Sequence, residues 1–300
     1  MLSITGTSGA ADIKGPYLAD ARDLGPAVNE DPYAIPVKNR DPHATNMYSR
    51  FDFGFMYWHQ DYKEDLPAPL KSTESGWIPG IFLSYEYNIR NAFYLKIFTE
   101  FSYGDDTYDG SDQMGNPLVF SDNNHQFLFR GEIDVGYNFA LSKSVAVKPY
   151  VGYGYRRWNR GQEAIIQGVA TYQERYYWHY IPVGVLVEVN VNDRLTVEPN
   201  AGVRYMFYGR ATAELSEVDP GFNDPAMKLG NRASYYVEMP IRYKLTNTWS
   251  IVLKPWFTYD QIGQSDPADL VYHGTVIGTA TEPSSTAQQY GINLGLSAAF

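Results

Sequence analysis

The 300-residue sequence contains no cysteine, so neither a disulfide framework nor a thiolate metal site can form. No apolar stretch approaches the roughly 18 residues that a transmembrane helix needs. Basic residues are also few, with 24 Lys and Arg against 34 Asp and Glu, and the net charge of -10 argues against nucleic acid as a partner. The first residues lack a basic segment followed by a long apolar one, so we expect a mature chain rather than a signal peptide.

Aromatic residues, by contrast, are abundant: they make up 16% of the chain and include 26 Tyr. Tyr and Trp are favoured where one end of a side chain lies in an apolar environment and the other in water. Without a membrane-spanning helix, such a chain is either a soluble protein or a membrane β-barrel, since a closed barrel also satisfies its backbone hydrogen bonds in lipid.

Two regions differ in pattern. Residues 1–46 are rich in Pro, Asp, Asn and Ala without any apolar period, and we interpret them as a periplasmic N-terminal extension. Residues 47–300 alternate between apolar and polar side chains, which is typical of strands with two unlike faces. Ten such runs occur, and they match or exceed the roughly 9–11 tilted residues that cross a bilayer. They cover residues 48–62, 77–89, 91–104, 124–140, 144–159, 171–190, 194–212, 231–245, 249–262 and 286–300.

The connections between these runs alternate strictly between two classes. Short turns rich in Asn, Asp, Ser and Thr lie at 88–91, 140–143, 190–193 and 246–248. Long polar connections lie at 63–76, 105–123, 160–170, 213–230 and 263–285. This predicts an all-β fold: a ten-stranded, antiparallel, up-and-down transmembrane β-barrel of a bacterial outer membrane. The short turns and both termini are then periplasmic, and the long loops are extracellular.

The two faces of the runs differ in charge. One face of every run is uncharged, as at Val183, Val185 and Leu253, which favours contact with lipid. The other face carries nine acidic and nine basic residues, which we expect to pair inside the barrel because an isolated buried charge is costly. The alternative is a soluble barrel with its apolar face inward. The expected lumen ion pairs involve Arg130, Glu132, Asp134, Lys148, Glu188, Glu198, Arg204, Glu238, Arg242 and Lys254.

The end of the last run, 290–300, alternates apolar residues and closes with Phe300. It resembles the C-terminal strand of bacterial outer-membrane proteins. This resemblance implies that the barrel-assembly machinery recognises the strand.

Two short motifs resemble the omptin family of outer-membrane proteases. One is Asp219-Pro220-Gly221 in the fourth long connection, and the other is the strand pair that begins at 234–237 and turns at 246–248. Omptins cleave peptides next to basic residues with an Asp pair and an Asp–His pair. Asp105 and Asp106 are candidates for the Asp pair, although loop carboxylates are commonly just solvated. The Asp–His pair has no counterpart, because no His occurs between His179 and His273.

A third feature is an Arg–aromatic cluster in 153–160, which faces 174–180 across a long connection. Such residues bind sugars, phosphates or acidic groups, and the alternative is an aromatic girdle whose Arg side chains reach lipopolysaccharide phosphates. His59, His125 and His179 also lie near extracellular strand ends, either as a metal or proton site or as part of that girdle. The candidate ligand residues are Arg156, Arg157, Trp158, Arg160, Arg175, Trp178 and His179.

Three functions follow from these patterns. The favoured one is a non-enzymatic outer-membrane barrel with a charge-filled lumen, whose loops contact lipopolysaccharide or a surface partner, without cofactor or metal. The alternatives are an omptin-like endopeptidase with an altered active site and a narrow channel for small solutes.

Overall fold

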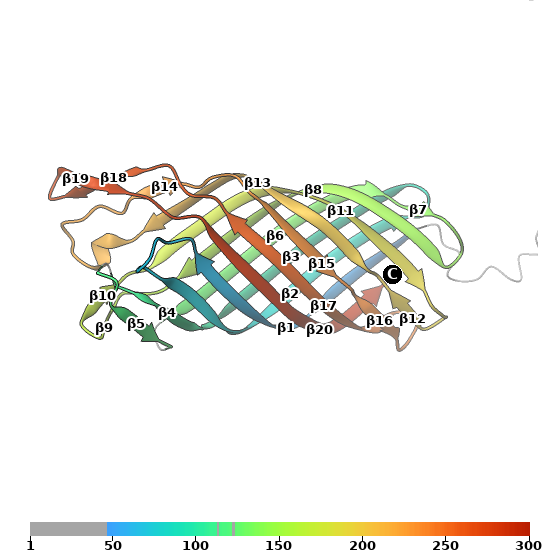
Figure 1. Cartoon of the computed structure of the whole chain (residues 1–300). Helices are drawn as coiled ribbons and strands as arrows, with labels where there is room; N and C mark the ends of the chain where they lie inside the picture. Colours follow the sequence, from blue (N-terminus) through green and yellow to red (C-terminus); the bar gives the residue numbers. More distant parts are fainter. Residues whose placement is uncertain (1–46, 113, 122–123) are drawn as a thin grey trace, which may run out of the picture. The chain divides into compact units, whose positions relative to one another are not determined.

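The computed structural model describes residues 47–112, 114–121 and 124–300, so the proposed extension, 1–46, lies outside the described residues. Antiparallel strands dominate this part (Figure 1). β1 pairs with β2 on one side and with β20 on the other, so the sheet closes on itself. Round the barrel the long strands are β1 (Met47–Glu64), β2 (Ser72–Ile89), β3 (Phe93–Asp105), β6 (His125–Tyr137), β8 (Val145–Arg160), β11 (Glu174–Asn190), β13 (Asn200–Ala213), β15 (Ala233–Glu238), β17 (Trp249–Ile262) and β20 (Ser285–Ala299).

These ten barrel strands coincide with the ten runs predicted from the alternation, so the predicted barrel is confirmed. Two of the ten are interrupted by a proline, which has no N–H to donate to the hydrogen-bond ladder of the sheet. Pro199 separates β12 (Leu195–Val197) from β13, and Pro240 separates β15 from β16 (Ile241–Lys244). The neighbouring strands still donate to the carbonyl groups of both prolines, at 2.9 and 2.8 Å. A third short piece, β7 (Phe139–Ala140), continues the wall of β6.

The long connections, which the sequence predicts as loops, contain further short strands. β4 (Thr107–Ser111) pairs with β5 (Pro117–Phe120), β9 (Ala164–Ile166) with β10 (Val169–Thr171), and β18 (Ala268–Tyr272) with β19 (Thr275–Ala280). In the last two hairpins both turn residues, Gln167-Gly168 and His273-Gly274, have positive φ, as a two-residue hairpin requires. A 3-10 turn (Leu215–Glu217) and β14 (Ala226–Lys228) complete these segments. Figure 1 shows the hairpins at one end of the barrel and the short turns at the other.

The apolar face of the strands lies on the outside. Phe55 is 75% exposed and Leu294 56%, whereas Lys148, on the inward face, is 0% exposed. An exposed apolar band in every wall greatly exceeds the patches of a few hundred Å² that soluble monomers tolerate. The alternative of a soluble barrel with an apolar interior is therefore wrong. Within the described residues, no helix is long and apolar enough to cross a membrane.

Charged and aromatic side chains share the interior. Lys148, Glu198 and Arg160 are buried there. A layer of buried aromatic and apolar side chains lies among such charges and includes Trp58, Tyr62, Trp158, Tyr176, Trp178 and Tyr180. Two of the cavities between these side chains have volumes of about 10 and 20 Å³, room for roughly one water each. Buried side chains thus occupy much of the lumen.

Candidate functional site

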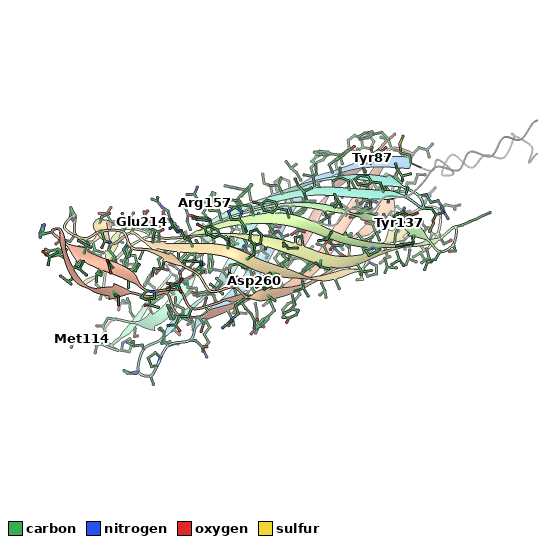
Figure 2. All side chains as sticks on the ribbon, turned by 90° about the horizontal axis from the view of Figure 1, so that it is seen from above. Tyr87, Met114, Tyr137, Arg157, Glu214 and Asp260 are labelled. Carbon is green, nitrogen blue, oxygen red and sulfur yellow. The ribbon has the colours of Figure 1, made fainter. Side chains whose placement is uncertain are left out.

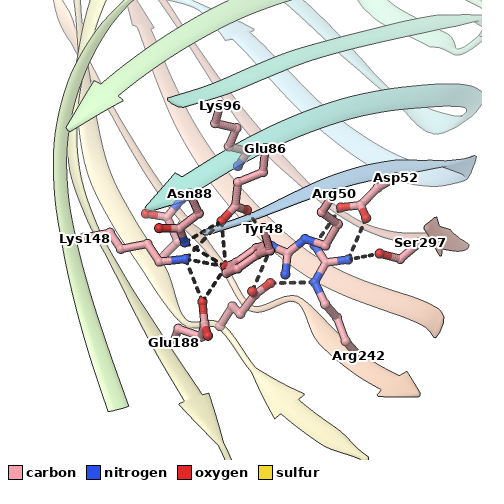
Figure 3. Close-up of polar contacts among 12 residues, drawn as sticks. Tyr48, Arg50, Asp52, Glu86, Asn88, Lys96, Lys148, Glu188, Arg242 and Ser297 are labelled. Carbon is pink, nitrogen blue, oxygen red and sulfur yellow. Dashed lines mark hydrogen bonds and ion pairs between the residues drawn. The ribbon is translucent and has the colours of Figure 1, made fainter. Parts of the chain in front are cut away.

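A network of ion pairs occupies the interior near the short turns (Figure 3). The ammonium of Lys148 donates to Glu188 at 2.6 Å, to Glu86 at 3.0 Å and to the hydroxyl of Tyr48 at 3.0 Å. Glu86 also accepts from Arg50 at 2.5 Å. Residues from β1, β2, β8 and β11 therefore meet in one cluster, and every charge in it has an opposite charge beside it.

A second group of this network is centred on Arg242 of β16. Its guanidinium donates to both oxygens of Asp52, at 2.6 and 2.7 Å, and to Glu198 at 2.8 Å. Glu198 lies 2.9 Å from Arg50 as well, which joins this group to the first. Such a two-pronged guanidinium–carboxylate pair is both strong and rigid.

The remaining predicted lumen residues also lie inside. Glu132 accepts from Arg204 at 3.0 Å, and Glu238 lies 3.2 Å from Lys96 and 3.4 Å from Lys254. Arg130 pairs with Glu100 at 3.0 Å. Asp134 differs, because its buried Oδ1 has no hydrogen-bond partner among the described residues. Each of these side chains points into the barrel, and each except Asp134 lies beside an opposite charge.

The Arg–aromatic cluster predicted as one ligand site is divided between the two faces of the barrel. Arg156 points inward to Asp260 at 2.6 Å and to Gln289 at 2.8 Å. Arg160 is also buried, where Glu174 accepts from it at 2.5 Å. Trp158 and Trp178 belong to the interior aromatic layer. These four predicted ligand residues cannot reach an external ligand, because consecutive residues of a strand alternate between faces.

The same alternation separates the two candidate catalytic carboxylates. Asp106 points inward and is 4% exposed, and it accepts from Gln60 at 2.7 Å and from Asn124 at 2.5 Å. Burial raises the pKa of Asp106. Asp105 points outward, where it bonds His125 on the opposite strand. The expected Asp pair is therefore not formed, and an Asp–His pair that the sequence analysis missed lies on the outer face.

The remaining predicted ligand residues lie on the outer face together with residues that the sequence did not indicate. Tyr177 of β11 stands opposite Arg157 of β8 and opposite Arg210 of β13, and Arg210 stands opposite Lys228 of β14. All three basic side chains are exposed. Arg175 is on this face too, but Glu214 accepts from it at 2.5 Å. Figure 2 places Arg157 and Glu214 toward the long-loop end of the barrel. We call Arg157, Tyr177, Arg210 and Lys228 the basic–aromatic row.

An aromatic belt borders this row on the membrane side. His179 bonds the hydroxyl of Tyr153 at 2.6 Å, and its ring lies 5.2 Å from Tyr155 and 5.8 Å from Tyr208. A register shift in the β11–β13 pairing leaves Phe207 and Tyr208 both exposed, as a β-bulge does. Tyr and His rings at one level are typical of a membrane–water interface.

The three histidines predicted near the extracellular strand ends do not converge. His59 contacts Trp77 and Tyr290, His125 bonds Asp105, and His179 bonds Tyr153. Across residues 47–112, 114–121 and 124–300, no group of three or more His, Asp or Glu side chains is arranged to hold a metal ion.

Comparison with known proteins shows which solved structures share this fold. No family model and no curated protein matches the sequence. The solved outer membrane protease OmpT from Escherichia coli aligns with a TM-score of 0.53 and 10% identity, over 85% of this chain and 97% of that one. The chain has an omptin-like outer-membrane β-barrel fold. Weaker likenesses include OprG from Pseudomonas aeruginosa (TM-score 0.36, 12% identity, 84% of this chain and 95% of that one) and the NalP translocator domain from Neisseria meningitidis (0.41, 9%, 86% and 90%).

At such identities the omptin-like barrel is a likeness of fold alone. Of the two motifs that suggested it, the first has a structural role. Asp219 accepts from the backbone of Gly221 at 2.7 Å and from Tyr272 at 3.1 Å, so it shapes its own loop. The face of the barrel that carries exposed basic side chains is then the strongest candidate for function.

Proposed function

We propose that this protein is an integral barrel of the bacterial outer membrane that binds lipopolysaccharide through the basic–aromatic row, with the long loops outside and both termini periplasmic. It neither conducts solutes nor cleaves peptides. The observation that carries this proposal is the outward alignment of Arg157, Tyr177, Arg210 and Lys228 across four strands, beside an aromatic belt.

The chemistry of the row fits a phosphorylated lipid. A guanidinium presents forked donors that match phosphate oxygens, and an ammonium adds a point charge. Arg157 and Arg210 are two strand spacings apart, about 10 Å, which leaves room for two separate phosphate groups. The aromatic belt beside them supports a position of both at the depth of lipid headgroups. The row is locally basic in a protein whose net charge is -10.

The interior supports the negative part of the proposal. Paired charges and an aromatic layer occupy the lumen, and the cavities of about 10 and 20 Å³ between them are too small for a solute to pass. The two carboxylates required for omptin-like chemistry face opposite sides of the wall. Recognition by the assembly machinery remains part of the proposal. It is supported by the C-terminal residue, Phe300, which pairs with Ser49 at the seam and is largely exposed.

The test replaces Arg157, Arg210 and Lys228 by Gln together and measures lipopolysaccharide binding to the folded barrel in detergent. Each hydrogen bond to a charged group contributes about 1.5–3 kcal/mol, so the triple variant should bind at least about tenfold more weakly. Dephosphorylated lipopolysaccharide should bind the parent equally poorly.

A matched control replaces Arg90, Lys143 and Arg194, three exposed bases near the short turns, by Gln. It changes the net charge by the same amount and should leave binding intact. Equal losses in both variants, or no loss in the first, would reject the row as the binding site.

A further inference from the structure

A cluster of Ser75, His59 and Asp61 lies on the outer face of the β1–β2 pair, away from the basic–aromatic row. Asp61 stands directly opposite Ser75, and His59 opposite Trp77. The hydroxyl of Ser75 lies 3.5 Å from Nε2 of His59 and donates to Oδ1 of Asp61 at 2.8 Å. Nδ1 of His59 lies 3.5 Å from Oδ2 of Asp61. The three side chains therefore contact one another in a closed triangle.

Aromatic neighbours hold the imidazole of His59 in one orientation. Its ring stacks on Tyr290 at 5.2 Å and meets the edge of Trp77 at 5.0 Å. The side chain is only 15% exposed, and its buried Nδ1 has no hydrogen-bond partner among the described residues. Nε2 is thus directed at a hydroxyl and Nδ1 at a carboxylate. This is the order in which a base activates a serine and an acid stabilises the base.

The surroundings indicate the class of substrate. Trp77 stacks on Tyr57 at 5.0 Å, and the exposed Phe55 follows toward the centre of the apolar band. On the other side, toward the long loops, come the charged Asp61 and Lys63. Ser75 therefore lies where apolar and polar surfaces meet, at the depth where an acyl chain of a membrane lipid joins its headgroup through an ester.

We propose that Ser75, His59 and Asp61 form an acyl-ester hydrolase site for lipids of the outer leaflet. The proposal rests on the membrane location given under the proposed function, but not on lipopolysaccharide binding by the row. Ser75 is the nucleophile, His59 the general base, and Asp61 the positioning residue.

The reaction has two balanced steps. Ser75 Oγ attacks the ester carbonyl carbon while Nε2 of His59 takes its proton, and the same proton passes to the alcohol oxygen as the ester C–O bond breaks. Water then attacks the acyl-serine, His59 takes a proton from it and returns a proton to Ser75 Oγ, and the fatty acid leaves. Asp61 turns from Ser75 to Nδ1 as the imidazolium forms, a rearrangement in keeping with the long hydrogen bonds of unliganded sites. Thr107 stands opposite Ser75 on β4, and its hydroxyl, which lies 3.1 Å from that of Ser121, is the donor that we assign to the oxyanion.

The test uses the full chain folded in detergent micelles, with a fluorophosphonate probe and p-nitrophenyl palmitate. The parent should carry the probe on Ser75, located by mass spectrometry of peptides, and should release p-nitrophenol. Ser75→Ala should abolish labelling, and His59→Phe, which keeps the ring stacking, should slow both reactions at least about 100-fold. Asp61→Asn should slow hydrolysis and change its pH profile, which a purely structural role would not do.

Ser49→Ala is the control, because Ser49 belongs to the short-turn end of β1, where its hydroxyl lies 3.2 Å from that of Tyr85. It should react like the parent. An unlabelled Ser75 in parent protein that still binds lipopolysaccharide would overturn the hydrolase proposal alone. If Ser75 is labelled but the protein fails to bind lipopolysaccharide, only the proposal that the basic–aromatic row binds lipopolysaccharide would be overturned. Hydrolysis that persists in Ser75→Ala would also reject the site.

Discussion

Replacement of Arg242 by Met tests whether the interior is closed and fully paired. Arg242 reaches from β16 to Asp52 on β1 and to Glu198 beside β12, at 2.6 to 2.8 Å. Met removes the charge and the donors while filling much of the same volume. Glu198 keeps Arg50 at 2.9 Å, so the main consequence is a buried Asp52 carboxylate without its two-pronged partner.

The expected loss of stability follows from burial. Removing one partner of a buried ion pair costs roughly 3–5 kcal/mol, because the other charge stays in a poorly solvated position. Lys71→Met is the matched control. Its ammonium lies 2.6 Å from Asp109, as close as the interior pair, but both side chains are 50% exposed. An exposed pair contributes at most about 1 kcal/mol.

Urea unfolding of the barrel in lipid vesicles, followed by tryptophan fluorescence, measures both variants. Asp52→Asn and the double variant that combines it with Arg242→Met complete a double-mutant cycle. Since Asn removes the charge that Arg242→Met leaves unpaired, the double variant should be much more stable than the sum of the two single losses predicts. If Arg242→Met costs no more than Lys71→Met, or if the cycle is additive, the interior is hydrated and the closed-lumen argument fails.

Three further predictions concern other parts of the molecule. Val185→Arg should destabilise the folded barrel by about 2–4 kcal/mol in vesicles, whereas a wall facing water would show almost no change. Burial raises the pKa of Glu282, which accepts from Tyr176 at 2.7 Å, so the stability that it contributes is present in acid and lost as the pH rises through the raised value. The melting temperature of Glu282→Gln, relative to that of the parent, should therefore increase as the pH rises. A difference in melting temperature that does not change with pH would contradict this. In planar bilayers the parent should show no stepwise conductance, and regular steps would refute a filled lumen.

The alternation along the chain was sufficient to predict the barrel and which face of its strands meets lipid. A strand has a period of two, and charges are excluded from the face that meets lipid, so both features are local. Asp105 and Asp106 are adjacent in sequence, as are Arg156 and Arg157, and each pair suggests a single site. The same period of two places adjacent strand residues on opposite faces, so neither pair forms one.

The partners of each residue, in contrast, depended on the closed barrel. Arg242 meets Asp52 across 190 residues, and Arg210 and Lys228 join Arg157 only through the pairing of β8, β11, β13 and β14. These contacts depend on strand register, on the bulge near Tyr208 and on the stagger between the strands at which the barrel closes. None of these is encoded in the local pattern of one strand, because each arises from how different strands are placed against one another. Tertiary structure alone therefore brought Ser75, His59 and Asp61 into contact.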